Sequence, residues 1–447
     1  MKFTLGYIAN NCGGKLSVSA NSNREISGFF TDSRTPEAAH LFLALRGERV
    51  DGNSFVPELL EKGYAVMTDR EENLSLGGDC IFVQDVRTAL QTLSGNYRFN
   101  ELKSVPIVGI TGSVGKTTTK EMVSLALSSS LSVHKTLGNS NSQIGLPQTL
   151  LATPADIECA VVELGMSMPG EMERIAACAA PDISVITNIG FSHIENLGTR
   201  EAICKEKLKI AFASSEDSVL ILNGDEPLLR TESYGNKKVC FVSVESNKCD
   251  CYPVNVTETE NGVEFTASVY GETVYVKLPV KGKHFVINSL FALAVASFLK
   301  LDLQKAANSL SQYESDGKRQ FIYEKDGHTV ISDCYNASPE SMEAALSVLS
   351  TYKCRRIAVL GDMLELGHES VALHRLVGEY VSGRADILVT YGDLSRYIAE
   401  TARNVSVYSF STDESESMLA FLNDLIKEGD AVLYKASNSI RLGRFIV

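Results

Sequence analysis

The sequence predicts an α/β protein of three units, with a doubly wound, mainly parallel sheet in the central unit. Three observations support this fold class. The chain has 447 residues, too many for one hydrophobic core. Short apolar runs alternate with helical stretches along most of the chain, as in strands joined by crossover helices. From Pro106 to Val123, an apolar strand, a glycine-rich turn and a helix follow one another directly.

Composition excludes several classes of protein. A net charge of −13 argues against nucleic acid or an anionic membrane as the main partner. The 10 cysteines have no framework spacing and are typical of reduced core residues in a cytosolic protein. No apolar run approaches the ~20 residues of a membrane span, and the N-terminus lacks the pattern of a signal peptide. We therefore expect a cytoplasmic protein without stable membrane association.

The first unit, residues 1–103, is predicted to be a small α/β domain. Two of its loops, Thr31–Arg34 and Leu45–Gly52, place arginine beside short polar residues. These loops are either solvated turns or an anion pocket, because guanidinium groups match phosphate oxygens. Its predicted strands are Ile26–Phe30, Leu41–Leu45, Ala65–Met67 and Cys80–Val83, and its predicted helices are Val56–Lys62 and Val86–Arg98.

The stretch Pro106–Val123 reads as a phosphate-binding loop that ends in Gly115-Lys116-Thr117. Backbone N–H groups of such a loop cradle phosphate oxygens, the lysine reaches the β and γ phosphates, and the threonine hydroxyl binds Mg²⁺. The strict spacing requires glycine at position 110, where Ile110 stands, with Gly109 one residue earlier.

Polar residues follow two predicted strands of the central unit, residues 104–313. Glu163 lies at the carboxyl end of the strand Cys159–Leu164, and His193 lies just past the strand Ile183–Ile189. Because parallel strands end at the same edge of a sheet, both side chains are expected beside the phosphate loop, where Glu163 could bind Mg²⁺. The polar loop Gly138–Pro147 is either a capped turn or a binding loop.

The rest of the chain continues the α/β pattern after one β-rich insertion. Alternating runs between residues 239 and 278 predict an antiparallel appendage, and an apolar helix follows Gly282. The third unit is residues 314–447. Its predicted strands are Val330–Ser332, Arg356–Leu360, Ile387–Tyr391, Val405–Phe410 and Ala431–Tyr434, with a helix at Pro339–Ser350.

Taken in chain order, these motifs resemble the Mur ligase family, the ATP-dependent amide-forming enzymes of bacterial cell-wall synthesis. The similarity covers nearly the whole chain. Its motifs here are Asp32–Arg34, Ala44–Glu48, Asp51–Gly52, Gly109–Thr118, Glu163–Gly165, Asn188–His193, Gly282–Asn288, Tyr335–Met342 and Gly361–Gly367. The last two resemble the type within the family that adds D-alanyl-D-alanine.

The resemblance implies a UDP-binding domain (1–103), an ATPase domain (104–313) and a Rossmann-like domain (314–447). It implies that ATP phosphorylates the terminal carboxylate of UDP-N-acetylmuramoyl-tripeptide to an acyl phosphate. The amine of D-alanyl-D-alanine then attacks, and phosphate leaves. This is a step of cytoplasmic peptidoglycan precursor synthesis, and we expect a monomer.

The resemblance also implies roles for single residues. The catalytic residues would be Lys116, Glu163, His193, Lys207 and Arg319. The Mg²⁺ ligands would be Thr117, Glu163, His193 and a carbamylated Lys207, with Lys205 as the alternative position of the carbamate. ATP would contact Gly112, Ser113, Val114, Gly115, Lys116, Thr117, Thr118, Asn288, Arg319, Asp333 and Asn336. The UDP-linked substrate would contact Ser33, Arg34, Arg46, Asn139 and Asn141.

The C-terminus departs from the family pattern. The family has Lys-Gly-Ser-Arg followed by Met-Glu, and this chain has Lys435–Asn438 and Leu442-Gly443. In the family, the missing arginine and glutamate are expected to line the part of the site that receives the incoming amine. A sister ligase with another amino acid or dipeptide as acceptor, and a non-catalytic nucleotide-binding relative, therefore stay open. The order of the motifs argues against a generic P-loop phosphotransferase.

Overall fold

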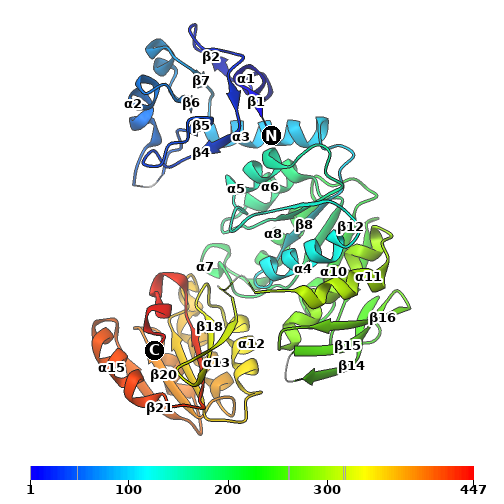
Figure 1. Ribbon diagram of the computed structural model, residues 1–447, viewed down its shortest axis with the longest axis vertical. Helices are drawn as coiled ribbons and strands as arrows, with labels where there is room; N and C mark the ends of the chain where they lie inside the picture. Colours follow the sequence, from blue (N-terminus) through cyan, green and yellow to red (C-terminus); the bar gives the residue numbers. More distant parts are fainter. Residues whose placement is uncertain (1, 48, 260–261, 316, 318) are drawn as a thin grey trace.

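The chain folds into three lobes that follow one another from the N-terminus to the C-terminus (Figure 1). The computed structural model describes residues 2–447 except 48, 260–261, 316 and 318. Glu48 and Lys318, which lie in or beside motifs quoted above, fall outside the described residues. In the part of the chain that is described, no helix is long and apolar enough to cross a membrane.

The N-terminal lobe is built on a small sheet with strand order β2-β7-β6-β5-β4. Its strands β4 to β7 are parallel, and β2 is antiparallel to β7. The predicted strand Ile26–Phe30 is divided, because β3 pairs with β1 while β4 joins the larger sheet. The elements are β1 (Phe3–Thr4), α1 (Leu5–Cys12), β2 (Lys15–Leu16), β3 (Glu25–Ile26), β4 (Gly28–Phe30), β5 (His40–Leu43), α2 (Val56–Glu61), β6 (Ala65–Thr68) and β7 (Cys80–Phe82).

Helix α3 (Val86–Asn100) joins this lobe to the central one. Asp85 caps its N-terminus by accepting a hydrogen bond from the Thr88 N–H. One side packs against α1, and the other packs against α5 (Gly145–Ala152) and α6 (Glu171–Ala179). Near its end the buried Arg98 pairs with Asp182 at 2.9 Å and donates to the Ala179 carbonyl. A buried charge with satisfied partners fixes this helix to the central lobe.

The central lobe contains a nine-stranded sheet with order β16-β15-β14-β13-β12-β11-β8-β10-β9. The strands from β9 to β14 run parallel, and β14, β15 and β16 are antiparallel. The predicted antiparallel appendage thus continues the same sheet. The strands are β8 (Ile107–Thr111), β9 (Val133–Lys135), β10 (Cys159–Glu163), β11 (Ile183–Ile186), β12 (Val219–Asn223), β13 (Lys238–Val242), β14 (Cys251–Thr259), β15 (Gly262–Val269) and β16 (Glu272–Leu278).

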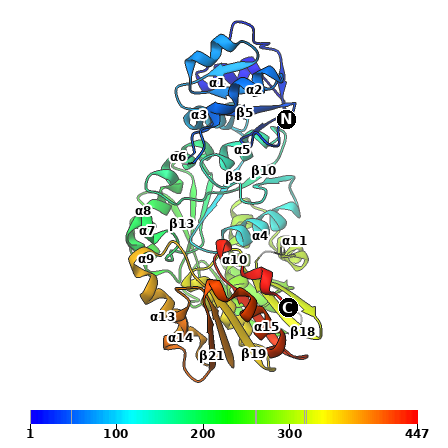
Figure 2. The ribbon, with the colours of Figure 1, turned by 90° about the vertical axis from the view of Figure 1, so that its left-hand side faces the viewer.

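Helices cover both faces of this sheet (Figure 2). Along β8, Val108 and Ile110 pack into the cluster that includes α4, whereas Ile107 packs on the opposite side. Such a strand is apolar throughout because it is buried on both faces. The remaining helices are α4 (Lys116–Ser128), α7 (Ile194–Leu197), α8 (Arg200–Leu208), α9 (Pro227–Thr231), α10 (Lys283–Phe298) and α11 (Leu303–Ser309).

The C-terminal lobe has a six-stranded sheet with order β17-β18-β22-β19-β20-β21, in which only the edge pair β17–β18 is antiparallel. Strand β20 has the predicted bounds, and Ser338 caps α12 with Pro339 in its first turn. The elements are β17 (Phe321–Lys325), β18 (His328–Asp333), α12 (Pro339–Leu349), β19 (Arg356–Gly361), α13 (Ser370–Val381), β20 (Ile387–Tyr391), α14 (Arg396–Thr401), β21 (Ser406–Phe410), α15 (Ser415–Leu425) and β22 (Ala431–Lys435).

Candidate active site

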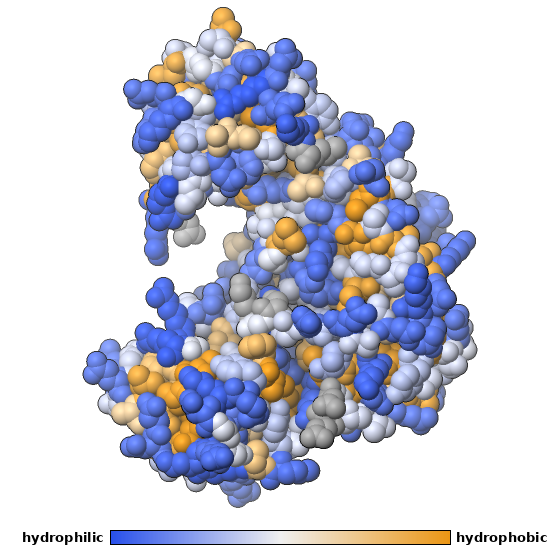
Figure 3. All heavy atoms as spheres, viewed as in Figure 1, coloured by the Kyte–Doolittle hydropathy of each residue, from blue (hydrophilic) through white to orange (hydrophobic). Residues whose placement is uncertain are grey.

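A cavity of about 1010 Å³ lies where the central and C-terminal lobes meet. It is large enough for a nucleotide together with part of a second substrate. The phosphate loop and the carboxyl ends of the central strands line one side, and residues of β18, α12 and the loop after β19 line the other. The outer surface is also hollowed between the N-terminal and C-terminal lobes, on the left of Figure 3.

The phosphate loop has the backbone that its glycines require. Strand β8 ends at Thr111 and helix α4 begins at Lys116, as predicted. Gly112 and Gly115 have φ angles of 155° and 81°, in the region that favours glycine. A Cβ atom on Gly112 would lie 1.9 Å from Thr187 Oγ1, so no other residue fits there. The loop backbone therefore turns tightly into the N-terminus of α4, a position that suits an anion.

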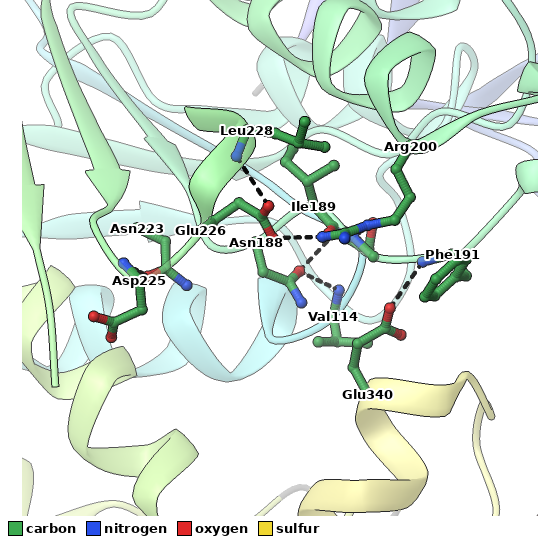
Figure 4. Close-up of polar contacts among 12 residues, drawn as sticks. Val114, Asn188, Ile189, Phe191, Arg200, Asn223, Asp225, Glu226, Leu228 and Glu340 are labelled. Carbon is green, nitrogen blue, oxygen red and sulfur yellow. Dashed lines mark hydrogen bonds and ion pairs between the residues drawn. The ribbon is translucent and has the colours of Figure 1, made fainter. Parts of the chain in front are cut away.

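The donors of this loop are held by neutral protein acceptors. Asn188 Oδ1 accepts from the Ser113 N–H at 3.0 Å. It also accepts from the Val114 N–H at 2.9 Å (Figure 4). Lys116 Nζ donates to the carbonyls of Gly112 and Ser113 at 2.8 and 3.3 Å. Burial lowers the pKa of Lys116, the Glu163 carboxylate raises it, and Arg319 lowers it. A bound phosphate would replace these neutral acceptors with charged oxygens as partners of the loop N–H groups and of Lys116.

The candidate Mg²⁺ residues Thr117 and Glu163 are in direct contact. Thr117 Oγ1 donates to Glu163 Oε2 at 2.8 Å, and Asn141 Nδ2 donates to Glu163 Oε1 at 2.8 Å. The Glu163 side chain is thus a buried carboxylate that accepts these hydrogen bonds from neutral donors. A hydroxyl and a carboxylate are oxygen ligands of the kind that Mg²⁺ takes.

These two residues cannot enclose a metal ion by themselves. Within the described ranges, no group of three or more His, Cys, Asp or Glu side chains could hold one. Mg²⁺ is usually bound by one or two carboxylates together with substrate phosphates. The donor set therefore fits a Mg²⁺ ion that arrives with a nucleotide.

His193 of the central lobe also lines the cavity, and its close polar neighbour belongs to the C-terminal lobe. Its Nδ1 atom lies 2.7 Å from Oε2 of Glu365, in the loop after β19. The neighbouring His193 ring lowers the pKa of Glu365, against the raising effect of burial. Sequence reasoning singled out His193 and missed this partner, although Glu365 lies in one of the quoted motifs.

Lys207 is the buried lysine of helix α8. Its side chain is 2% exposed and makes no hydrogen bond or ion pair with any described residue. Burial and the nearby Lys116 lower its pKa well below the ordinary value. Lys205, by contrast, is exposed. A neutral amine is the form that reacts with CO₂, so the geometry favours Lys207 over Lys205 for carbamylation. Lys207 is not among the residues that line the cavity.

The C-terminal lobe contributes a braced set of polar residues. Lys435 Nζ lies 2.6 Å from Asp333 Oδ2 and donates to the Asn336 carbonyl at 3.0 Å. The guanidinium of Arg319 stacks 4.2 Å above the Tyr335 ring. Lys435 was not predicted as a site residue. In the sequence, Lys435 follows the apolar run Ala431–Tyr434 directly and begins the segment Lys435–Asn438 that was compared with the family motif.

Asn288 and His284 reach the site from helix α10. The Asn288 amide accepts from Thr119 Oγ1 at 3.1 Å, and a Cβ on Gly115 would lie 3.3 Å from its Oδ1. Asn288 thus abuts the start of α4. Desolvation lowers the pKa of His284 to about 4, so its ring is neutral at physiological pH.

The predicted substrate residues divide into two groups. Asn139 and Asn141 line the cavity, but Ser33, Arg34 and Arg46 do not. Arg34 pairs with Asp32 at 2.6 Å and is 86% exposed, and Arg46 pairs with Asp69 at 2.9 Å. The arginine loops therefore lie on the N-terminal lobe, apart from the cavity. Arg87, in the first turn of α3, is a cavity residue that sequence reasoning missed.

The loop Asn188–His193 is anchored from both sides (Figure 4). Arg200 donates to the Ile189 carbonyl at 2.6 Å and pairs with Glu226 at 2.8 Å. From the C-terminal lobe, Glu340 Oε1 accepts from the Phe191 N–H at 3.0 Å. Burial raises the pKa of Glu340, and its Oε2 is enclosed without a hydrogen-bond partner among the described residues.

Three segments of the chain match domains of one family. Residues 25–98 match the Mur ligase family catalytic domain, residues 110–296 the Mur ligase middle domain, and residues 318–438 the Mur ligase glutamate ligase domain. The order of these matches is the order of the three lobes.

Curated relatives cover the same length. The chain is 38% identical to the UDP-N-acetylmuramoyl-tripeptide–D-alanyl-D-alanine ligase of Bacillus subtilis, over 100% of this chain and 98% of that protein. It is 36% identical to the Synechocystis protein of the same name, over 94% and 91% of the two chains.

Solved structures agree in fold over nearly the whole chain. A structure of MurF from Acinetobacter baumannii superposes with a TM-score of 0.89 at 26% identity and covers 100% of this chain and 98% of that one. MurF from Thermotoga maritima, in complex with ADP, gives a TM-score of 0.84 at 29% identity, over 94% and 96% of the two chains. The chain therefore belongs to the Mur ligase family.

Proposed function

We propose that this protein joins D-alanyl-D-alanine to UDP-N-acetylmuramoyl-tripeptide at the expense of ATP, through an acyl phosphate. The observation that carries the proposal is the shared cavity. It is lined by a phosphate loop and Glu163 from the central lobe and by Asn336 and Glu365 from the C-terminal lobe. The B. subtilis relative is named for this activity, and the T. maritima structure contains ADP.

The chemistry requires phosphate because a carboxylate is a poor electrophile. Attack of the substrate carboxylate oxygen on the γ-phosphorus of ATP releases ADP and gives an acyl phosphate. The dipeptide amine then attacks the acyl carbon, an amide bond forms, and the phosphate leaves with the former carboxylate oxygen. Phosphoryl transfer depends mainly on positioning and on neutralising charge.

The central lobe supplies the phosphate side of the reaction. Lys116 and the N–H groups of Ser113 and Val114 would hold the phosphate oxygens, once freed from their present acceptors. Thr117 and Glu163, with His193 and carbamylated Lys207, would hold Mg²⁺, which neutralises charge on the transferred phosphoryl group when bound.

The C-terminal lobe would complete the nucleotide side. Arg319, Asp333 and Asn336 line the cavity opposite the phosphate loop. We expect these residues to contact ATP, together with Asn288 of α10, which abuts the start of α4. Closing the cavity from a second lobe would also keep water away from the acyl phosphate.

The N-terminal lobe would hold the UDP portion of the substrate. Ser33, Arg34 and Arg46 would bind the diphosphate, and Asn139 and Asn141 would contact the part that enters the cavity. The proposed domain limits are 1–103, 104–313 and 314–447, with a monomer as the functional unit.

Phosphate release by the purified full-length protein tests the function. The protein is given ATP, Mg²⁺ and UDP-N-acetylmuramoyl-tripeptide, with and without D-alanyl-D-alanine. Release that depends on both substrates is expected. Release that ignores the dipeptide, or that prefers a single amino acid, would assign the acceptor to a sister ligase. No turnover with any acceptor would favour a non-catalytic relative.

A further inference from the structure

Five lysine and arginine side chains line the active-site cavity, and four of them have a partner within the protein. The partners are a loop carbonyl for Lys116, Asp333 for Lys435, Glu245 for Lys283 and the Tyr335 ring for Arg319. Arg87 makes no hydrogen bond, ion pair or ring contact with any other residue that the structure describes. Its guanidinium group is therefore free to bind an anionic group of a ligand.

Arg87 lies where the N-terminal lobe meets the central lobe. It belongs to the first turn of helix α3, which runs between the two lobes (Figure 1). One turn later, Gln91 Nε2 donates to the Gln143 carbonyl at 3.2 Å, and Gln143 also lines the cavity. This hydrogen bond holds the start of α3 against the polar loop of the central lobe. The exposed Arg87 side chain is thus kept at the end of the cavity that is nearest the N-terminal lobe.

The charged side chains next to this polar loop bind to one another. Glu171 Oε1 accepts from Gln143 Nε2 at 2.8 Å, and its Oε2 accepts from the Ser167 N–H at 2.7 Å. Arg174 Nε donates to Gln143 Oε1 at 2.9 Å. Because both oxygens of Glu171 are occupied, this carboxylate is not available as a partner for Arg87.

Asp85, two residues before Arg87, does not form an ion pair with it. Its carboxylate caps α3 and accepts from the Thr88 N–H at 2.7 Å. Burial raises the pKa of Asp85, but the hydrogen bonds from Thr88 and the charges of Arg87 and Arg46 lower it below the ordinary value. Both guanidinium groups are therefore within electrostatic range of one carboxylate. Arg46 lies outside the cavity and Arg87 lines it, so positive charge extends from the Arg46 loop into the cavity.

We propose that Arg87 binds a carboxylate of the peptide part of the substrate, one that is not phosphorylated in the reaction. The inference rests on the proposed function, in which the diphosphate lies at Arg34 and Arg46 and the reacting carboxylate faces the phosphate loop. The peptide between these two points passes the end of the cavity where Arg87 lies. A planar guanidinium matches a carboxylate with two parallel hydrogen bonds, so Arg87 selects for peptides that carry this group.

Two groups of a tripeptide have the required chemistry. A γ-linked glutamyl residue keeps its α-carboxylate, and a diaminopimelyl residue in third position has a second carboxylate on its side chain, whereas a lysyl residue has none. Three UDP-N-acetylmuramoyl-tripeptides therefore serve as probes. They contain L-alanyl-γ-D-glutamyl-L-lysine, the same peptide with the glutamyl carboxylate converted to its amide, and L-alanyl-γ-D-glutamyl-meso-diaminopimelate.

The test is equilibrium binding of each probe to the full-length protein by titration calorimetry, without ATP, so that no reaction takes place. We expect Arg87→Ala to raise the Kd of the diaminopimelate probe by about 10- to 100-fold and to leave that of the amide probe unchanged. Arg87→Lys, which keeps the charge but loses the planar fork, should recover part of the loss. Lys103→Ala removes an exposed lysine just beyond the end of α3, outside the cavity, and should bind all three probes like the wild type.

The lysine probe identifies which carboxylate Arg87 binds. An equal loss with the lysine and diaminopimelate probes would assign the glutamyl carboxylate, and a loss confined to the diaminopimelate probe would assign the carboxylate of the third residue. In turnover, Arg87→Ala should raise the KM for the peptide substrate and leave kcat and the KM values for ATP and the dipeptide unchanged. An unchanged Tm would show that the fold is intact.

Three outcomes would overturn this role. Wild-type affinity of Arg87→Ala for all three probes would show that Arg87 does not bind the substrate. An equal loss with the amide probe would show that Arg87 binds another group, such as the diphosphate. A rise in the KM for ATP alone would assign Arg87 to the nucleotide. A wild type that binds none of the three probes would instead refute the proposed function, and the role of Arg87 with it.

Discussion

The two halves of the active-site cavity are stabilised in different ways. In the central half, Thr117, Glu163 and Asn141 bond to one another within one lobe, and Lys116 is held by its own loop. In the C-terminal half, Lys435 braces Asp333 internally, but Glu340 and Glu365 reach across to the central lobe. The central half is therefore preformed by local structure, whereas the relation between the halves depends on a few contacts between lobes.

The comparison predicts that the brace in the C-terminal half is worth the most in stability. Lys435 is 1% exposed, and Lys435→Met would leave the Asp333 carboxylate, 15% exposed, without its cation. Breaking a buried ion pair costs about 3–5 kcal/mol. We expect a loss at the low end of this range, measured by chemical unfolding of the C-terminal lobe. The double variant Lys435→Met/Asp333→Asn should regain part of it, and a double variant no more stable than the single one would contradict the brace.

The central half should dominate the phosphoryl transfer. Lys116→Ala removes the cation of the phosphate loop and should lower kcat by about 10²–10³-fold, because the lost charge acts mainly in the transition state. Lys103→Ala, an exposed lysine that lies just before the central lobe, is the control. Phosphate release under saturating substrates measures both. A Lys116→Ala variant within a few-fold of the wild type would show that the loop does not hold the transferred phosphate.

The two lysines of helix α8, Lys205 and Lys207, are expected to differ in their effect on turnover. Lys207→Ala should lower turnover by about 10- to 100-fold through loss of a metal ligand, and Lys205→Ala should leave it unchanged. Removal of CO₂ and bicarbonate should slow the wild type and the Lys205→Ala variant alike. Equal losses in both variants, or a fully active Lys207→Ala protein, would rule out the carbamate at Lys207.

Glu340 gives the smallest effect and tests the contact between the lobes through pH. Burial raises its pKa, so the folded protein binds a proton that the unfolded chain releases. Stability contributed by this group therefore falls as pH rises from its ordinary pKa to its folded pKa. Glu340→Gln keeps the acceptor for the Phe191 N–H and removes the charge. The difference in Tm between variant and wild type should thus shift in favour of the variant by a degree or so as pH rises from about 4 to 7.

Independence of that difference from pH would show that Glu340 titrates normally. Glu340→Ala should be less stable than Glu340→Gln by about 1–3 kcal/mol, because it leaves the buried Phe191 N–H unpaired. Equal stability of the two variants would indicate that the carboxylate does not hold the loop.

The sequence predicted the central half of the cavity better than the contacts between the lobes. The start of α4 at Lys116 and the presence of strands β10 and β11 were predictable, because a glycine-rich turn and apolar strands leave strong local patterns. The predicted end of β11 at Ile189 was wrong, since the strand ends at Ile186. These elements carried Thr117 and Glu163 to one edge. Short strands were not predicted from the sequence. Strand β9, for example, has three residues and is polar at two of them. Their pairing is decided by neighbours in the sheet, not by their own sequence.

Contacts between lobes left no local pattern. Glu365 and Glu340 lie in motifs that the resemblance singled out, but which side chains they meet depends on how two separately folded lobes dock. Lys435 lies 99 residues from Asn336, and only the sheet order β18-β22 brings them together. The loops at Arg34 and Arg46 differ in the opposite way. Their sequence motif is clear, but neither arginine lines the cavity.

The central claim is that the γ-phosphate of ATP is delivered to a peptide carboxylate in this cavity. Isotope transfer tests it most directly. UDP-N-acetylmuramoyl-tripeptide is labelled with ¹⁸O in its terminal carboxylate and turned over with ATP and D-alanyl-D-alanine, and the released phosphate is analysed by mass spectrometry. The account predicts that each phosphate carries one ¹⁸O atom from the substrate. Phosphate without ¹⁸O would show that the phosphoryl group goes to water and would contradict the account.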